Sequence, residues 1–433
     1  MHSNRNQSLK GLSRSSLLEY TQRGNRFATF FGDSISAQGF GGTDSTGRIF
    51  ASVGYATWAA FLSRQRIILT PDSNQGVSGE TTTQILNRLT TVVDLEPGVC
   101  VVLAGTNDIA AIPVATTISN LDTIYDTLYA SGIYTIAIPI LPRGDLTSAQ
   151  YGKIHQVNQW IRAQRLLRRN FAVADCELAF IDLATGVPKA TMVNNVVDEI
   201  HPIVYGAWAV GNAVAQILNE IYPDPLLPFI NRLDIYHATE NPGGNLLAGS
   251  VGLTEGTTGT KSNGPTGNLA TSWSANGVNL PVGVTVAFDK VVKADGREFQ
   301  QVTFGGTYNN ASPSSFNVTA PSVHASCAAG DTIEYVAELE MDAGSSNLAG
   351  AQLLLDVATP SGNPSPGDLA ANNTNLMPPV AISGVSKTAR VILPATPTLV
   401  RPTIRFYFKG VTGSSALSAV VRWGSVSARK VLY

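Results

Sequence analysis

Between residue 26 and about residue 222, short apolar runs alternate with longer segments in which apolar residues recur at helical spacing. The expected strands cover residues 27–31, 66–69, 99–103, 134–140 and 179–183, and the expected helices cover residues 55–64, 81–93, 116–130, 148–168 and 205–221. Strands that alternate with helices indicate βαβ units, whose right-handed crossovers place helices on both faces of a parallel sheet. We therefore predict a three-layer α/β sandwich over residues 26–222.

The fourth expected helix shows how the pattern defines a buried face. Thr147 or Ser148 can cap its start, because a side-chain oxygen there accepts a hydrogen bond from a free backbone N–H. Ile154, Val157 and Ile161 then recur at helical spacing. These three side chains should face the sheet.

The composition changes after residue 223, where three prolines in six residues end the last helix and predict a stiff linker over residues 223–240. Beyond it, helical periodicity is lost and Gly, Thr, Ser, Asn and Val dominate. The expected strands cover residues 282–288, 299–304, 332–340, 352–357, 390–393, 403–409 and 419–426. Short alternating runs separated by turn residues predict an antiparallel β-sandwich over residues 241–433. Residues 1–25 are expected to form a polar N-terminal extension and residues 249–267 a long loop.

Individual side chains of this second half also carry expectations. Trp273 and Trp423 are predicted to pack in the core, although a platform for sugar rings is an alternative. Glu338 and Glu340 lie two residues apart and should share one solvated face of a strand.

The overall charge bears on two classes of partner, nucleic acids and anionic membranes. A net charge of −2, with 14% charged residues, gives no electrostatic reason to expect nucleic acid or an anionic membrane as partner.

The first ten residues are polar and predict no signal peptide, and no apolar run is long enough to span a bilayer. We therefore leave open a cytoplasmic location and a virion-associated or extracellular one reached by a non-classical route. A homo-oligomer is also left open.

Cysteine and histidine usage predicts neither disulfides nor a metal site. Cys100, Cys176 and Cys327 are too few for a disulfide framework, and Cys100 lies in an apolar run where a buried, inert thiol is expected. No pair of histidines has the spacing of metal ligands. The sequence therefore predicts no bound metal.

Four polar blocks follow strands or precede helices: Gly32-Asp33-Ser34, residues 74–82, residues 105–108 and residues 198–202. Because the carboxyl ends of parallel strands meet at one edge of an open sheet, we expect the blocks to converge there. Asp33 and Asp108 are interpreted as hydrogen-bond acceptors that organise their loops.

Together the blocks contain the groups that acyl transfer needs. Ser34 can act as nucleophile if a base takes its proton, and His201 is the candidate base. Asp198, three residues before the histidine, can set its tautomer and stabilise the imidazolium. The backbone N–H groups of Ser34 and Gly79 and the side-chain amide of Asn107 can donate to the oxyanion of the tetrahedral intermediate.

This set resembles the SGNH (GDSL-type) hydrolase family, which is named for its Ser, Gly, Asn and His blocks. The resemblance covers about residues 26–222 and carries the family motifs onto Ser34, Gly79, Asn107 and His201, with Asp198 as the acid of the Asp-x-x-His motif. It implies a flavodoxin-like α/β fold and ester hydrolysis without a cofactor. The family acts on lipids, thioesters and acetylated sugars, so membership does not define the substrate.

The C-terminal half resembles, in pattern only, the jelly-roll β-sandwich of carbohydrate-binding modules, on residues 295–304 and 420–428. An esterase domain beside such a sandwich favours a carbohydrate O-acetylesterase that acts on a polysaccharide and is associated with a phage tail. One alternative is a lipid or short-chain carboxylesterase acting on a small acylated substrate. The other is a glycan-binding or structural protein that keeps an inactive hydrolase scaffold.

Overall fold

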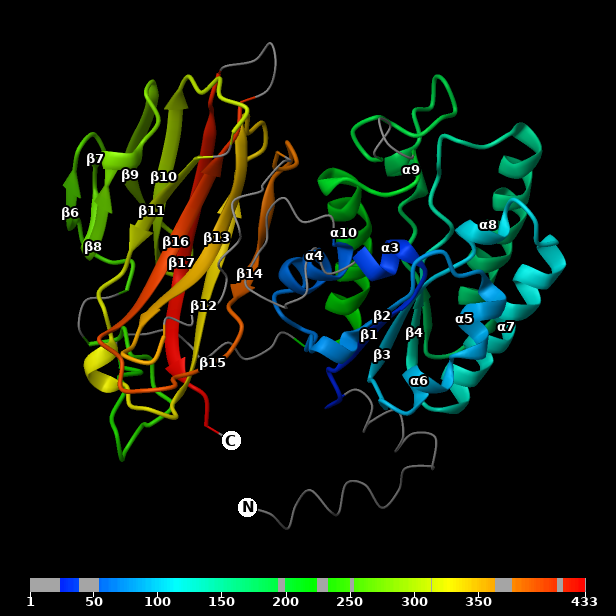
Figure 1. Cartoon of the computed structure of the whole chain (residues 1–433), viewed down its shortest axis with the longest axis horizontal. Coiled ribbons are helices and arrows are strands. Elements are labelled where there is room, and N and C mark those ends of the chain that lie inside the picture. Colours follow the sequence, from blue (N-terminus) through cyan, green and yellow to red (C-terminus); the bar gives the residue numbers. More distant parts are fainter. Residues whose placement is uncertain are drawn as a thin grey trace. The chain divides into compact units, whose positions relative to one another are not determined.

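The computed structural model describes residues 24–38, 54–193, 199–223, 233–249, 253–312, 314–362, 376–410 and 416–432 (Figure 1). Among them, residues 24–223 belong to one compact unit and residues 233–432 to another. Most of the predicted N-terminal extension and half of the predicted linker, residues 224–232, lie outside the described residues. None of the helices in the described ranges is long and apolar enough to cross a membrane.

The first unit is built on a parallel sheet of five strands in the order β2-β1-β3-β4-β5. The strands are β1 (Ala28–Gly32), β2 (Asn74–Gly76), β3 (Val99–Leu103), β4 (Tyr134–Ala137) and β5 (Phe171–Val173). Every residue of β1 and β3 is buried, as expected for central strands with helices on both faces. The strand order is that of the flavodoxin-like doubly wound fold, which confirms the predicted fold class.

Helices cover both faces of this sheet. They are α3 (Ser34–Ala37), α4 (Tyr55–Leu62), α5 (Thr82–Asn87), α6 (Thr90–Val93), α7 (Val114–Ala130), α8 (Ser148–Leu167), α9 (Glu177–Phe180) and α10 (Val204–Ile221). The start of α8 confirms the predicted cap, because the Thr147 side chain accepts a hydrogen bond from Gln150 N–H. Ile154, Val157 and Ile161 are buried, also as predicted.

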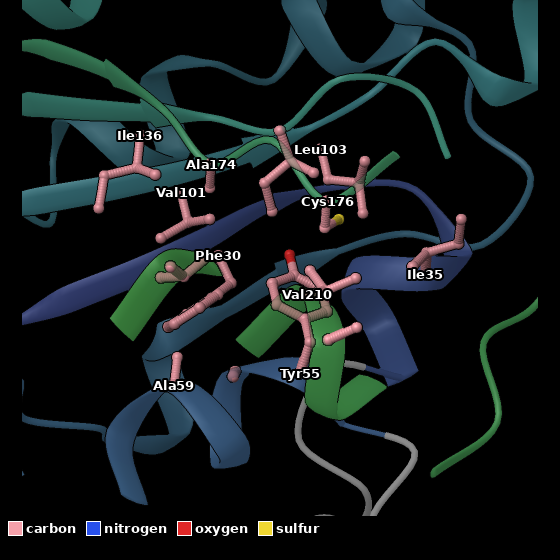
Figure 2. Packing of buried hydrophobic residues seen from close by; sticks show 14 of the residues in the cluster. Phe30, Ile35, Tyr55, Ala59, Val101, Leu103, Ile136, Ala174, Cys176 and Val210 are labelled. Atoms are coloured by element: carbon pink, nitrogen blue, oxygen red, sulfur yellow. The ribbon is translucent and has the colours of Figure 1, made fainter. Parts of the chain in front are cut away.

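Alternation along β1 gives the sheet two separate cores. Phe30 packs on one face with Tyr55 of α4 and Val210 of α10 (Figure 2). Phe31 packs on the other face, in a cluster that includes Leu121 of α7 and Val157 of α8. Because successive side chains of a strand point to opposite faces, the one apolar run fills both layers.

Two strand predictions of the first unit are wrong. Residues 66–69 contribute only an isolated bridge between Ile68 and Phe27, and the second strand is β2, Asn74–Gly76. Residues 179–183 overlap α9, and Phe171–Val173 pairs with β4 instead. Leu183 is 81% exposed, so its apolar character does not mark a buried strand. Both true strands have only three residues, too few to produce a periodic signal.

The second unit contains a seven-stranded sheet and a five-stranded sheet. The first has the order β14-β12-β17-β10-β9-β7, with β15 beside β12, and the second has the order β13-β16-β11-β8-β6. Most pairs are antiparallel, as predicted, whereas β6 with β8 and β7 with β9 are parallel. The strands are β6 (Thr258–Ser262), β7 (Thr266–Gly267), β8 (Leu269–Asn276), β9 (Val284–Val292), β10 (Glu298–Gly306), β11 (Ser314–Thr319), β12 (Thr332–Met341), β13 (Leu348–Ala358), β14 (Ile382–Lys387), β15 (Val391–Ile392), β16 (Leu399–Phe408) and β17 (Ala419–Lys430).

Aromatic rings from both sheets pack together in this unit. Trp273 of β8 lies 5.9 Å from Trp423 of β17, and Phe406 of β16 lies 4.9 Å from Phe304 of β10, measured between ring centroids. Both tryptophans are completely buried, which confirms their predicted place in the core. The contacts join opposite sheets, so the unit is a β-sandwich.

Three expectations for the second half need correction. The predicted loop over residues 249–267 contains β6 and β7, whose Thr, Ser and Gly residues gave no apolar signal. Strands β8, β11 and β14 were not predicted, because polar residues occupy much of each run. Glu338 is buried and forms an ion pair with Arg297 at 2.6 Å, so it does not lie on a solvated face.

Candidate active site

The first polar block lies where β1 ends and α3 begins. Gly32 is the last residue of β1, and a Cβ built on it would come within 2.0 Å of the Leu103 carbonyl oxygen of β3. The neighbouring strand therefore requires glycine at this position. Asp33 then caps α3 by accepting a hydrogen bond from Ile35 N–H at 3.0 Å. As a result, Ser34 is held in the first turn of a helix at the carboxyl end of a central strand.

His201 lies beside this serine. Its Nε2 atom is 2.8 Å from Ser34 Oγ, within hydrogen-bond distance. The histidine comes just before α10, which begins at Val204 and packs on the sheet through Val210. A hydroxyl and an imidazole at this separation can exchange a proton directly.

Asp198, the third member of the predicted triad, lies outside the described residues. Its role as partner of His201 stays a prediction. The neighbouring Glu199 is described, and its backbone oxygen accepts a hydrogen bond from Gly144 N–H at 2.9 Å.

Gly79 lies in the loop between β2 and α5 in a left-handed conformation, with φ of +82°. Apart from its chain neighbours, no described residue has a heavy atom within 4 Å of a Cβ built on this glycine. Side chains with a Cβ disfavour this φ, so the backbone conformation favours glycine. The open space beside Gly79 is compatible with the close approach of a ligand to its amide.

Asn107 lies in the short 3₁₀ turn Thr106–Asp108 after β3. Its Nδ2 donates to the Glu80 carbonyl oxygen at 2.9 Å, so the third block is bonded to the residue that follows Gly79. The adjacent Asp108 carboxylate is buried and accepts from Thr82 N–H at 2.8 Å and from Thr117 Oγ1 at 2.7 Å. This confirms the interpretation of Asp108 as a residue that organises its loop.

The structure therefore links the predicted blocks in pairs. Ser34 meets His201, Val77 N–H of the second block donates to Gly32 O at 3.0 Å, and Asn107 meets Glu80. The hydroxyl–imidazole pair and the Gly79–Asn107 region are thus connected through the ends of β1 and β2. This arrangement can supply a nucleophile, a base and donors to a developing negative charge.

Asp33 is an unusual carboxyl group in this site. It is 1% exposed, and its Oδ2 atom has no hydrogen-bond partner among the described residues. Burial raises the pKa of Asp33 to about 7, while the bond from Ile35 N–H and the nearby His201 act in the opposite direction. The group is therefore half ionised near neutral pH, beside the imidazole.

Two arginines of the site were not predicted from the sequence. Arg143 follows β4, donates from Nη1 to Thr106 O at 2.9 Å and pairs with Asp145 at 2.6 Å. Its place beyond the carboxyl end of a strand is the signal that could have identified it. Arg88 donates to Gly32 O at 2.8 Å from the C-cap of α5. Its position inside an apolar helical pattern gave no such signal.

Part of the chain is similar to a known protein family. Residues 30–209 match the sequence profile of the GDSL-like Lipase/Acylhydrolase family, a range that contains all four blocks. A comparison with curated proteins gives no match. Among solved structures, the chain is similar to a GDSL-like lipase from Bacteroides thetaiotaomicron, with 19% identity, a TM-score of 0.36, and 50% of this chain and 96% of that chain covered. It is also similar to an acetylxylan esterase from Geobacillus stearothermophilus, with 18% identity, a TM-score of 0.36, and coverage of 45% and 94%.

Proposed function

Because residues 30–209 form a domain of the GDSL-like lipase/acylhydrolase family, we propose that the chain is a serine esterase with Ser34 as nucleophile and His201 as base. The observation that carries the proposal is the 2.8 Å separation between Ser34 Oγ and His201 Nε2. In the first step the Ser34 oxygen attacks the ester carbonyl carbon while its proton moves to Nε2. The imidazolium then returns this proton to the departing alcohol, which leaves an acyl-serine.

The second step releases the acid. Water attacks the acyl-serine, Nε2 takes a proton from the water, and the proton passes back to Ser34 Oγ as the carboxylic acid leaves. In both steps negative charge develops on the carbonyl oxygen. We assign its stabilisation to the backbone N–H groups of Ser34 and Gly79 and to the Asn107 amide. Asp198 is assigned to orient His201, and no cofactor takes part.

We further propose that the substrate is an O-acetylated carbohydrate. The second unit supports this with a groove of about 600 Å³ whose lining is mainly polar. Its lining residues include Ser274, Asn276, Ser315, Asn317 and Arg401. Hydroxyl and amide groups both donate and accept hydrogen bonds, as the hydroxyl groups of a glycan require. Attachment to a phage tail is part of the same proposal, and detection of the chain in purified particles would test it.

Acyl release from p-nitrophenyl acetate and from an O-acetylated polysaccharide, by the protein and its Ser34→Ala variant, tests the proposal. Loss of both activities in the variant would support a serine carbohydrate esterase. If the unaltered protein cleaves only p-nitrophenyl acetate, and Ser34→Ala loses this activity, the result would support the alternative, a lipid or short-chain carboxylesterase. Ser148→Ala is the matched control, because Ser148 also begins a helix, α8. Equal activity of Ser34→Ala and the unaltered protein would exclude the mechanism and favour the glycan-binding alternative.

A further inference from the structure

Arg88 is bonded through all three of its guanidinium nitrogens. Nη2 donates to Gly32 O at the end of β1, and Nη1 donates to Gln75 O within β2, each at 2.8 Å. Nε donates to Glu80 Oε2 at 2.5 Å. The guanidinium also lies 4.7 Å from the centroid of the Phe31 ring. One side chain thus joins the segment before Ser34 to the loop that carries Gly79.

Glu80 extends this connection to Asn107. Its carboxylate accepts from Arg88, and its backbone oxygen accepts from Asn107 Nδ2 at 2.9 Å. An asparagine amide has two donor hydrogens in one plane. The bond to Glu80 engages one of them and orients that plane, so it also determines where the second hydrogen points.

We propose that Arg88 is a positioning residue for the oxyanion donors, acting through Glu80 on Asn107. The inference rests on the proposed esterase function. Donors to an oxyanion contribute only when they are held at hydrogen-bond distance before the charge develops. Arg88 provides that constraint because it ties the Glu80 loop to the strand that ends beside Ser34.

A purely structural ion pair is the competing explanation. The side chains of Arg88 and Glu80 are only 18% and 16% exposed, so removal of either also lowers stability. A structural role would lower stability and leave kcat of the folded protein unchanged. A positioning role lowers kcat with little change in KM, because the affected interaction is made in the transition state.

The test compares Arg88→Met, Arg88→Lys and Glu80→Gln. Each substitution is made alone and together with Asn107→Ala. The assay is p-nitrophenyl acetate hydrolysis, with kcat, KM and Tm measured on the full chain. We expect Arg88→Met to lower kcat by about 10- to 100-fold, with KM changed by less than about threefold. Arg88→Lys should retain part of the activity, since an ammonium cannot reproduce the forked geometry.

The Asn107→Ala background separates the two explanations. If Arg88 acts through Asn107, Arg88→Met should lower kcat by less than about threefold once the amide is gone. Equal losses in both backgrounds would overturn the inference. If Arg88→Met fails to fold, the milder Arg88→Lys and Glu80→Gln variants carry the same comparison.

Arg168 supplies the matched control. It pairs with Asp122 and Asp126, donates from Nε to Gln164 Oε1 and lies 5.7 Å from the Tyr125 ring centroid. Arg168→Met should therefore lower Tm and leave kcat unchanged. Ser34→Ala in the same assay separates the two proposals. Full activity of Ser34→Ala would overturn both, whereas an inactive Ser34→Ala beside a fully active Arg88→Met would overturn only the role of Arg88.

Discussion

His201 Nε2 lies 2.8 Å from Ser34 Oγ, although 167 residues separate them along the chain. Ser34 is held by the end of β1 and the first turn of α3, and His201 by the segment before α10. Phe30 of β1 and Val210 of α10 belong to the same buried cluster, on one face of the sheet. The pair is therefore a product of the folded core, and the first prediction concerns its two members.

His201→Ala and Ser34→Ala should each lower kcat by about a thousandfold or more, and the double variant should be no worse than either single one. The reason is that nucleophile and base act as a unit, so removal of one makes the other ineffective. Steady-state kinetics on p-nitrophenyl acetate measures this. If the two losses multiplied, the residues would act independently and the pairing would have no catalytic meaning.

Asp198→Asn should lower kcat by at least about a hundredfold, because an amide cannot stabilise the imidazolium and favours the wrong tautomer. Glu199→Gln is the control, since it removes a carboxylate one position away and leaves the backbone bond to Gly144 in place. The kcat values of both variants on the same ester show which carboxylate acts as the acid beside His201. A loss in Glu199→Gln with none in Asp198→Asn would transfer the acid role to Glu199.

Gly79→Ala should destabilise the protein by about 1–2 kcal/mol, because φ is +82° and L-residues disfavour the left-handed region. It should also lower kcat/KM, since the new methyl group enters the open space beside the amide. Gly186→Ala separates the two effects. Gly186 lies outside the candidate site and has a φ of +73°, and a Cβ built on it also has no described residue beyond its chain neighbours within 4 Å. Chemical unfolding should give similar losses for both variants, and only Gly79→Ala should lose activity.

Asp33→Asn should change the pH dependence of stability. Burial raises the Asp33 pKa to about 7, so between about pH 4 and pH 7 the folded protein keeps a proton that the unfolded chain releases. Stability from this group is therefore greatest at low pH and falls as pH rises toward 7. A shift of this size corresponds to about 4 kcal/mol.

Urea unfolding at pH 4 and pH 8 tests this prediction. The amide of Asp33→Asn does not ionise. From pH 4 to pH 8 its free energy of unfolding should therefore rise by about 4 kcal/mol relative to that of the unaltered protein. The difference between the two proteins cancels the contribution of other titrating groups. Parallel stability curves would contradict the prediction, because they would mean that Asp33 has an ordinary pKa in the folded protein and is ionised over most of this range.

The sequence predicted long helices and fully buried strands well. Strand β3 was predicted with its observed bounds, and α7, α8 and α10 within two residues at each end. These elements have a strong period or a continuous apolar run. The three-residue strands β2 and β5 were missed, because pairing with a neighbouring strand, rather than their own composition, makes them strands.

The sequence by itself determined the alternation of long helices with buried central strands and the residue types of the four polar blocks. These features depend on local periodicity and on motifs that are short in the chain. Only the tertiary structure decided which side chains meet. Arg88, Glu80 and Asn107 form one network because strands β1, β2 and β3 end at the same edge of the sheet. Contacts between residues distant in the chain depend on strand order and packing, which no single segment encodes.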